Sequence, residues 1–146
     1  MAIALFHPAH PGRLLTVLRP PWDPHLPGIW GLPATGIAPG ETPEEALHRC
    51  LRIKLGLPAR RWALLGEGWQ EEGGPHRMLL YGGEAERDVC SLPPAHPGDP
   101  ITLYVAWRWA TPEALEEGAR RGSLCCRLFL AWSAGRHGDS LGLDTP

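Results

Sequence analysis

Hydrophobic and polar positions in the first thirty residues predict two short β-strands and a loop. Apolar residues run without interruption through residues 2–6 and 14–18, and the turn-rich segment His-Pro-Ala-His-Pro-Gly separates the two runs. Short apolar runs bounded by Pro and Gly are typical of strands. Residues 20–28 hold four prolines. Because proline removes a ladder donor and disfavours helix at the preceding residue, we expect a loop there.

The strongest helix prediction covers Pro43 to about Leu55. Thr42 suits the N-cap, Pro43 suits the first helical position, and Glu45 completes a Thr-x-x-Glu capping box. Gly56 then provides the C-terminal stop. Helical spacing predicts one apolar face toward the core and one polar face toward solvent. The apolar face holds Ala46, Leu47, Leu51 and Leu55, and the polar face holds Glu44, His48 and Arg52.

The second half of the chain alternates predicted strands and helices. We expect strands over residues 77–81 and 101–109, a short helix over 111–117, and either a helix or a strand over 125–132. The period-two pattern of the second strand puts four apolar side chains on one face: Leu103, Val105, Trp107 and Trp109. The tail after about residue 135 is expected to be loose.

Length, charge and hydropathy favour one domain with a small ligand or a protein partner. The 146 residues suit a single domain over residues 1–146, which could bury roughly 70% of the surface that its unfolded chain exposes. A formal charge of −2 gives no basic surface for extended nucleic acid. With no apolar run near 18 residues, we expect no membrane insertion.

Composition favours a cytoplasmic protein with a thermophile-like make-up. The four cysteines have no C-x-x-C spacing, so reduced thiols in a reducing compartment are expected. Arginine outnumbers lysine 13 to 1, asparagine is absent, and glutamine occurs once. Avoidance of thermolabile amides is typical of thermophilic proteins.

Residues 30–57 carry the chemistry of the chain and read W-G-L-P-A-T-G-I-A-P-G-E-T-P-E-E-A-L-H-R-C-L-R-I-K-L-G-L. This segment resembles the signature of the Nudix (MutT-like) hydrolase family, which reads G, five residues, E, seven residues, R-E, an aliphatic residue, one residue, E-E, one residue, G, aliphatic. Without a gap, the frame falls on Glu41, Arg49, Leu51 and Gly56. The resemblance implies an α/β fold, a Nudix-like α/β/α sandwich with a mixed sheet.

The departures from this signature are as specific as the matches. Within the box, residues 35–57, the family's three metal-binding glutamates fall on Cys50, Ile53 and Lys54. The i, i+3, i+4 spacing puts these positions on one helical face, where a thiol, a butyl group and an ammonium cannot hold a hard divalent cation. In the family, Mg²⁺ or Mn²⁺ neutralises a diphosphate and activates water. The resemblance therefore implies severely impaired hydrolysis, and no metal cofactor is expected.

The candidate ligand-binding residues lie in or beside this box: Thr35, Gly36, Glu41, Arg49 and Lys54. The resemblance implies that Glu41 and Arg49 mainly brace the loop against the helix. Lys54, the one lysine of the chain, has two interpretations. It could hold a fixed ammonium against a phosphate in place of the metal, but a solvated helix lysine is commoner. No catalytic residue is assigned, since Cys50 has no base that the sequence places beside it.

Three functions stay open. The first is a degenerate Nudix protein, weak or lacking in metal-dependent hydrolysis, that binds a nucleotide, a related diphosphate ligand or a partner. The second is an active hydrolase of a nucleoside diphosphate linked to another moiety, with Mg²⁺ or Mn²⁺ held by Glu45 or by carboxylates from residues 67–86. The third is an interaction module with an unused cleft, in which Trp22 or Trp69 mediates homodimer or heteromer contact.

Overall fold

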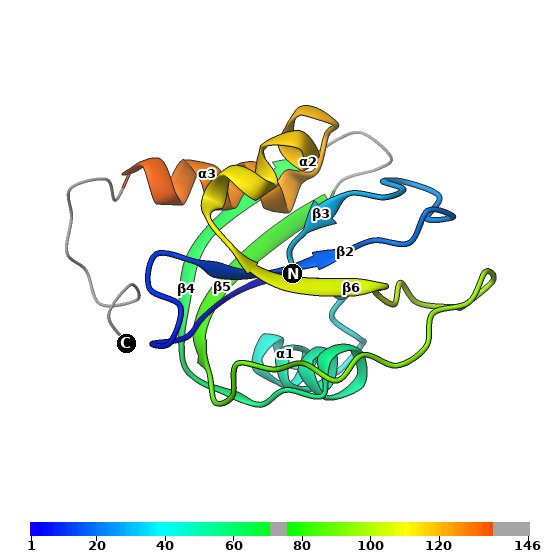
Figure 1. The fold of residues 1–146 in the computed structure, drawn as a ribbon, viewed down its shortest axis with the longest axis horizontal. Helices are drawn as coiled ribbons and strands as arrows, with labels where there is room; N and C mark the ends of the chain where they lie inside the picture. Colours follow the sequence, from blue (N-terminus) through cyan, green and yellow to red (C-terminus); the bar gives the residue numbers. More distant parts are fainter. Residues whose placement is uncertain (71–75, 136–146) are drawn as a thin grey trace.

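Two three-stranded sheets form the middle layer of the protein (Figure 1). The computed structural model describes residues 1–70 and 76–135. One sheet has the order β1-β5-β4 and is mixed, because β1 runs parallel to β5 and β4 runs antiparallel to it. The other has the order β3-β2-β6 and is antiparallel. The strands are β1 (Ala2–Phe6), β2 (Leu14–Leu18), β3 (Trp30–Gly31), β4 (Ala59–Gln70), β5 (His76–Ala85) and β6 (Ala106–Ala110).

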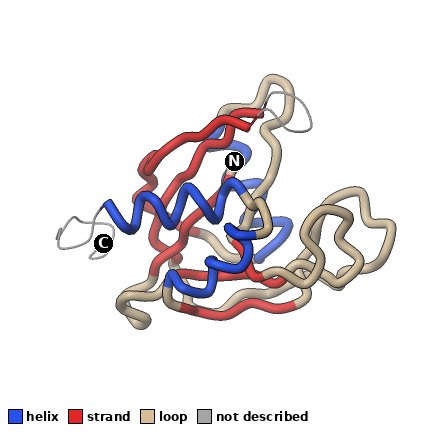
Figure 2. The backbone as a smooth tube through the Cα atoms, turned by 90° about the horizontal axis from the view of Figure 1, so that it is seen from above, coloured by secondary structure: helices blue, strands red, loops and turns tan. Residues whose placement is uncertain are grey.

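Helices cover both sides of this layer, which confirms the expected α/β/α arrangement. Helix α1 (Pro43–Cys50) and the π-helix that continues it (Leu51–Leu55) lie on one side (Figure 1). A 3₁₀ turn (Pro112–Leu115), α2 (Glu116–Arg120) and α3 (Leu124–Gly135) lie on the other. Figure 2 shows α3 crossing over the strands. No helix in residues 1–70 and 76–135 combines the length and apolar character needed to cross a bilayer.

Strand β1 is buried on both faces, and this burial accounts for its continuously apolar sequence. Ile3 and Leu5 belong to a hydrophobic cluster shared with α1, whereas Ala2, Ala4 and Phe6 belong to a second cluster under α3. The first cluster also holds the predicted helix positions Ala46, Leu47, Leu51 and Leu55. The second also holds Leu14, Leu80, Cys126 and Phe129.

The capping box predicted for α1 is present. Thr42 Oγ1 accepts a hydrogen bond from Glu45 N at 3.1 Å, and Glu45 Oε1 accepts one from Thr42 N at 2.8 Å. Gly56 ends the helical segment in the left-handed region at φ 57°. The predicted extent is confirmed, but the last five residues form a π-helix rather than an α-helix. The four apolar positions predicted for the core are buried, and Lys54 is buried as well.

Strand β4 was not predicted, because its sequence lacks the period-two pattern. Its burial pattern is irregular, and the pairing with β5 shifts register between Arg60 and Ala63 and again between Leu64 and Gly66. Arg61 lies at the first shift and has a positive φ of 59°. Each bulge moves later side chains to the opposite face of the sheet, which removes the alternation that sequence analysis detects.

Three other expectations need correction or completion. The predicted strand over 101–109 begins only at Ala106, and Val105 is 42% exposed instead of sharing a buried face with Trp107 and Trp109. Residues 125–132 are helical, within α3. The short helix predicted over 111–117 is present as the 3₁₀ turn and α2. The expected loose tail after 135 lies outside the described residues.

Gly83 on β5 tests how tightly the strand packs against Trp62. A Cβ atom at Gly83 would lie 2.5 Å from two ring carbons of Trp62, whereas a Cβ atom at Gly66 on β4 would meet nothing within 4 Å. We expect Gly83→Ala to lower the free energy of unfolding by ~1–3 kcal/mol through overpacking. Gly66→Ala, measured in the same urea titration, should stay within ~0.5 kcal/mol. Equal effects of the two substitutions would contradict this packing.

Candidate functional site: a cleft built around a buried lysine

A cavity of about 750 Å³ lies between the π-helix and the start of α3. Its wall comes from the loop after β3 (Ala34–Gly36), Lys54 of the π-helix, the 101–104 segment and the start of α3 (Ser123–Cys125). Arg19, which directly follows β2, also lines it. We call this cavity the cleft. Three of the predicted ligand-binding residues therefore lie in its wall: Thr35, Gly36 and Lys54.

Lys54 is buried, so its interpretation as a solvated helix lysine is wrong. The residue is 5% exposed, and Nζ donates a hydrogen bond to Ala34 O at 2.7 Å. Nζ also lies 5.5 Å from the centroid of the Tyr104 ring. Among the described residues, no carboxylate oxygen lies within 4.0 Å of Nζ. Burial lowers the pKa of Lys54 below its ordinary value of 10.5.

The peptide group of Ala34 is held from several directions. Its carbonyl accepts from Lys54 Nζ, from Tyr104 Oη at 3.5 Å and from Cys50 Sγ at 3.8 Å. Its N–H donates to Tyr104 Oη at 3.0 Å. Tyr104 is 2% exposed, and burial raises the pKa of its phenol. The loop therefore presents its carbonyl to a buried ammonium, with a neutral phenol and a neutral thiol beside it.

The three positions at which the family has metal-binding glutamates hold side chains that do not fit a divalent cation: Cys50, Ile53 and Lys54. Cys50 is 1% exposed, and burial raises the pKa of its thiol, which keeps it protonated. Ile53 is 41% exposed, whereas Lys54 is 5% exposed. The remaining groups, a thiol and an ammonium, are unsuited to Mg²⁺.

Carboxylates elsewhere in the described residues do not gather into a substitute site. In residues 1–70 and 76–135 no three His, Cys, Asp or Glu side chains lie close enough together to hold a metal ion. Glu84, one of the carboxylates in the 67–86 stretch, is instead paired with Arg60 at 2.7 Å. Glu71 and Glu72 of the same stretch lie outside the described residues.

Glu41 and Arg49 brace the loop against α1, as the resemblance implied. Arg49 Nε and Nη2 each lie 2.8 Å from one oxygen of the Glu41 carboxylate. Arg49 Nη2 also donates to Gly36 O at 2.8 Å, and Nη1 donates to Thr35 Oγ1 at 3.3 Å. Hydrogen bonding from Arg49 lowers the pKa of Glu41 to about 2. These two residues hold the wall of the cleft in place and do not themselves line it.

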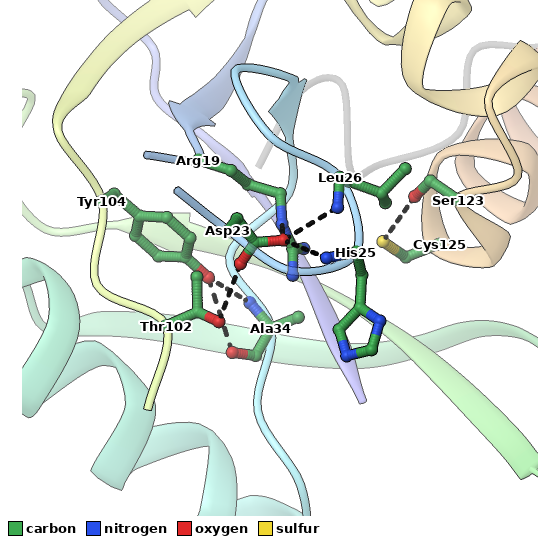
Figure 3. Close-up of polar contacts among 9 residues, drawn as sticks. All are labelled: Arg19, Asp23, His25, Leu26, Ala34, Thr102, Tyr104, Ser123 and Cys125. Atoms are coloured by element: carbon green, nitrogen blue, oxygen red, sulfur yellow. Dashed lines mark hydrogen bonds and ion pairs between the residues drawn. The ribbon is translucent and has the colours of Figure 1, made fainter. Parts of the chain in front are cut away.

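Asp23 does not line the cleft but bonds to Arg19 and Thr102, which do, and the sequence did not reveal this role (Figure 3). Its side chain is 2% exposed. Oδ2 accepts from Arg19 Nε at 3.2 Å, His25 N at 3.2 Å and Leu26 N at 2.8 Å, while Oδ1 accepts from Thr102 Oγ1 at 3.3 Å. Its place in Trp-Asp-Pro-His was the one available signal, because Asp side chains commonly bond to backbone N–H groups two and three residues on.

The start of α3 closes the other side of the cleft. Ser123 Oγ accepts a hydrogen bond from Cys126 N at 3.3 Å and lies 3.3 Å from Cys125 Sγ. Hydrogen bonds from Cys126 and Ser123 lower the pKa of the Cys125 thiol. The cleft wall thus holds Lys54, Arg19, Arg121, Met1 and the start of α3. The Met1 ammonium donates to Thr35 O at 2.7 Å, and Arg121 lies 3.6 Å from Glu117. Asp23, which precedes the wall residues Pro24 to Leu26, is bonded to four donors.

Comparison with known proteins agrees with this architecture. The family profile described as NUDIX domain matches residues 1–127. The chain belongs to the Nudix family. The RNA pyrophosphohydrolase of Marinomonas sp. (strain MWYL1) is 41% identical over 54 residues, which are 36% of this chain and 34% of that protein. The chain therefore spans about a third of the length of this curated relative.

Solved structures of other Nudix proteins have the same fold. The NUDIX domain of Shewanella oneidensis NrtR, complexed with ADP ribose, matches with a TM-score of 0.65 and 17% identity, covering 94% of this chain and 84% of that one. The MutT protein from Methanosarcina mazei Go1 matches at 0.62 and 13%, covering 92% and 91%. The C. elegans Ap4A hydrolase matches at 0.61 and 15%, covering 94% and 97%. These likenesses establish the fold.

Glu41→Gln tests the brace through its dependence on pH. A carboxyl whose folded pKa is depressed stabilises the fold above its unfolded pKa, and this contribution is lost as the pH falls toward the folded value. We therefore expect Glu41→Gln to lower the melting temperature at pH 7, and the difference from wild type to shrink between about pH 4.5 and about pH 2. Glu44→Gln, at an exposed side chain on α1, is the control. A difference that does not change with pH would refute the assignment.

Lys54→Met tests the cost of the buried ammonium. Replacing a buried charge without a carboxylate partner by an apolar side chain of similar length should raise the free energy of unfolding at pH 7 by ~1 kcal/mol or more. Because the folded pKa of Lys54 lies below its unfolded value, this gain should shrink as the pH rises toward 10.5. Arg52→Met, exposed on the same helical segment, should change stability by less than ~0.5 kcal/mol. Loss of stability in Lys54→Met at every pH would contradict this account.

Proposed function

We propose that this Nudix protein binds a nucleotide or a related diphosphate ligand in its cleft without a divalent metal, and that it has little or no metal-dependent hydrolase activity. The observation that carries the proposal is the buried ammonium of Lys54. It occupies one of the box positions at which the family has a metal-binding glutamate. The Lys54 ammonium thus stands where a glutamate carboxylate would bind a metal ion.

The charge of Lys54 favours an anionic ligand. One of the three ammonium protons is directed to Ala34 O. No carboxylate oxygen in the described residues lies within 4.0 Å of Nζ, and the more distant charge of Asp23 offsets the ammonium only in part. An anion 4 Å from the ammonium would gain about 4 kcal/mol at an effective dielectric constant of 20, before its own desolvation is counted. A phosphate that enters the cleft therefore offsets a charge that has no carboxylate in direct contact.

Binding and hydrolysis place different demands on this cation. An ammonium can neutralise a phosphate oxygen and donate hydrogen bonds to it. It cannot supply an open coordination position, and it cannot lower the pKa of a bound water in the way that a divalent metal does. The donor set of Cys50, Ile53 and Lys54 therefore supports ligand binding and gives no support to the activation of a water nucleophile. No residue is assigned a catalytic role.

The compared proteins indicate the class of ligand. The NrtR structure contains ADP ribose, and the C. elegans protein is named for Ap4A, so both names specify nucleotides with linked phosphates. A ligand of this class would place its phosphates near Lys54 and the loop residues Thr35 and Gly36. We also place the protein in the cytoplasm, where its four free cysteines would stay reduced.

Calorimetric titration with ADP-ribose and ADP in the presence of EDTA tests the proposal. We expect binding in EDTA, no turnover when Mg²⁺ or Mn²⁺ replaces EDTA, and an affinity about tenfold or more lower in Lys54→Met. The Arg52→Met control should bind as the wild type does. Since Lys54→Met is expected to be more stable than wild type, its weaker binding would not reflect unfolding.

Two outcomes would overturn the proposal. Turnover that appears only with Mg²⁺ or Mn²⁺ would establish an active hydrolase with relocated metal ligands. Failure of the wild type to bind either nucleotide would favour an interaction module, and its exposed aromatic residues Trp22 and Trp69 would then be the surfaces to examine.

A further inference from the structure

Arg19 is a further cation of the cleft, on a different element from Lys54. The other two, the Met1 ammonium and Arg121, are directed to Thr35 O and to Glu117. Arg19 follows β2, its side chain is 20% exposed, and it lines the same cavity. Its charge acts on three groups of the cleft wall: it lowers the pKa values of Lys54 and Cys125, and it opposes the rise in the pKa of Tyr104 that burial causes. Figure 3 places Arg19 between the Tyr104–Ala34 contact and the Ser123–Cys125 pair.

Asp23 fixes the position of this guanidinium and only partly balances its charge. Arg19 Nε donates to Asp23 Oδ2 at 3.2 Å, and Asp23 is the one acceptor that the described residues provide to the guanidinium. The same carboxylate oxygen also accepts from His25 N and Leu26 N, and the other accepts from Thr102 Oγ1. The Asp23 charge is therefore shared among several donors, and the two terminal nitrogens of Arg19 are left for another acceptor.

Resting on the proposed function, we propose that Arg19, positioned by Asp23, is the second cation of a metal-free clamp that selects ligands with two linked phosphates over monophosphates. A guanidinium offers a planar fork that matches phosphate oxygens, whereas an ammonium acts as a point charge. Arg19 and Lys54 line the same cavity and repel each other there. Burial is the main cause of the lowered pKa of Lys54, and the charge of Arg19 adds to it. A diphosphate that bridges them relieves this repulsion with one phosphate on each cation, and a monophosphate occupies only one.

The ratio of ADP affinity to AMP affinity in EDTA measures this selection. We expect the wild type to prefer ADP, and Arg19→Met to lose about tenfold or more in ADP affinity with less than about threefold loss for AMP. Arg19→Lys should restore part of the ADP affinity, because it keeps the charge and loses the fork. Arg52→Met, with the same change in net charge at an exposed position, should leave the ratio unchanged.

Asp23→Asn tests the positioning role separately. If Asp23 acts through Arg19, the substitution should lower the ADP-to-AMP ratio in the wild-type background and add no further loss in the Arg19→Met background. Thr102→Val removes one donor to Asp23 and keeps the Arg19 pair. Because Thr102 also lines the cleft, its ADP-to-AMP ratio is compared in place of its absolute affinity, and this ratio should stay at the wild-type value. Equal losses for ADP and AMP in Asp23→Asn would identify a purely structural residue and refute the positioning role.

The outcomes separate this inference from the proposed function. If the wild type binds neither nucleotide in EDTA, metal-free binding itself is wrong. If the wild type binds ADP but Arg19→Met leaves the ADP-to-AMP ratio unchanged, the clamp is wrong and binding through Lys54 stands. A melting temperature for each variant shows whether a lost affinity comes from a folded protein.

Discussion

The hydrogen bond from the Lys54 ammonium to the Ala34 carbonyl is the constraint on which the cleft depends. It joins the π-helix to the loop after β3 at 2.7 Å, in an environment where Lys54 is only 5% exposed. A buried ammonium cannot be left unsatisfied, so the loop must direct a carbonyl toward it. Tyr104 then fixes the same peptide by bonding to its N–H. The Lys54 ammonium and the Tyr104 phenol together fix the Ala34 peptide in the cleft wall.

The Glu41–Arg49 pair holds the loop after β3 against α1 without any metal ligand. Arg49 joins the Glu41 carboxylate to the carbonyl of Gly36 and the hydroxyl of Thr35, so the loop keeps its place on α1. None of these contacts requires a metal. The contacts that hold the loop on α1 are therefore independent of the positions at which the family has metal-binding glutamates.

Local signals in the sequence predicted much of the fold, and tertiary signals were missed. The β1 and β2 strands, the capping box of α1 and the Gly56 stop depend on neighbouring residues, and the structure confirms them. Strand β4 has two register shifts, which erase its periodicity. The burial of Lys54 and the four bonds of Asp23 depend on residues distant in sequence, such as Ala34 and Thr102. No pattern over a short window could reveal them.

The energetics of Lys54 argue against a position that has merely lost its function. A lysine that reached solvent would contribute almost nothing to stability, and an apolar residue would pack in the same space without a desolvation penalty. The fold instead keeps a charge in its interior, beside a second cation at Arg19. Asp23 offsets only part of the repulsion between these two cations, and a bound polyanion would offset more of it. Binding sites typically carry such charges, which lower the stability of the free protein and raise its affinity for the ligand.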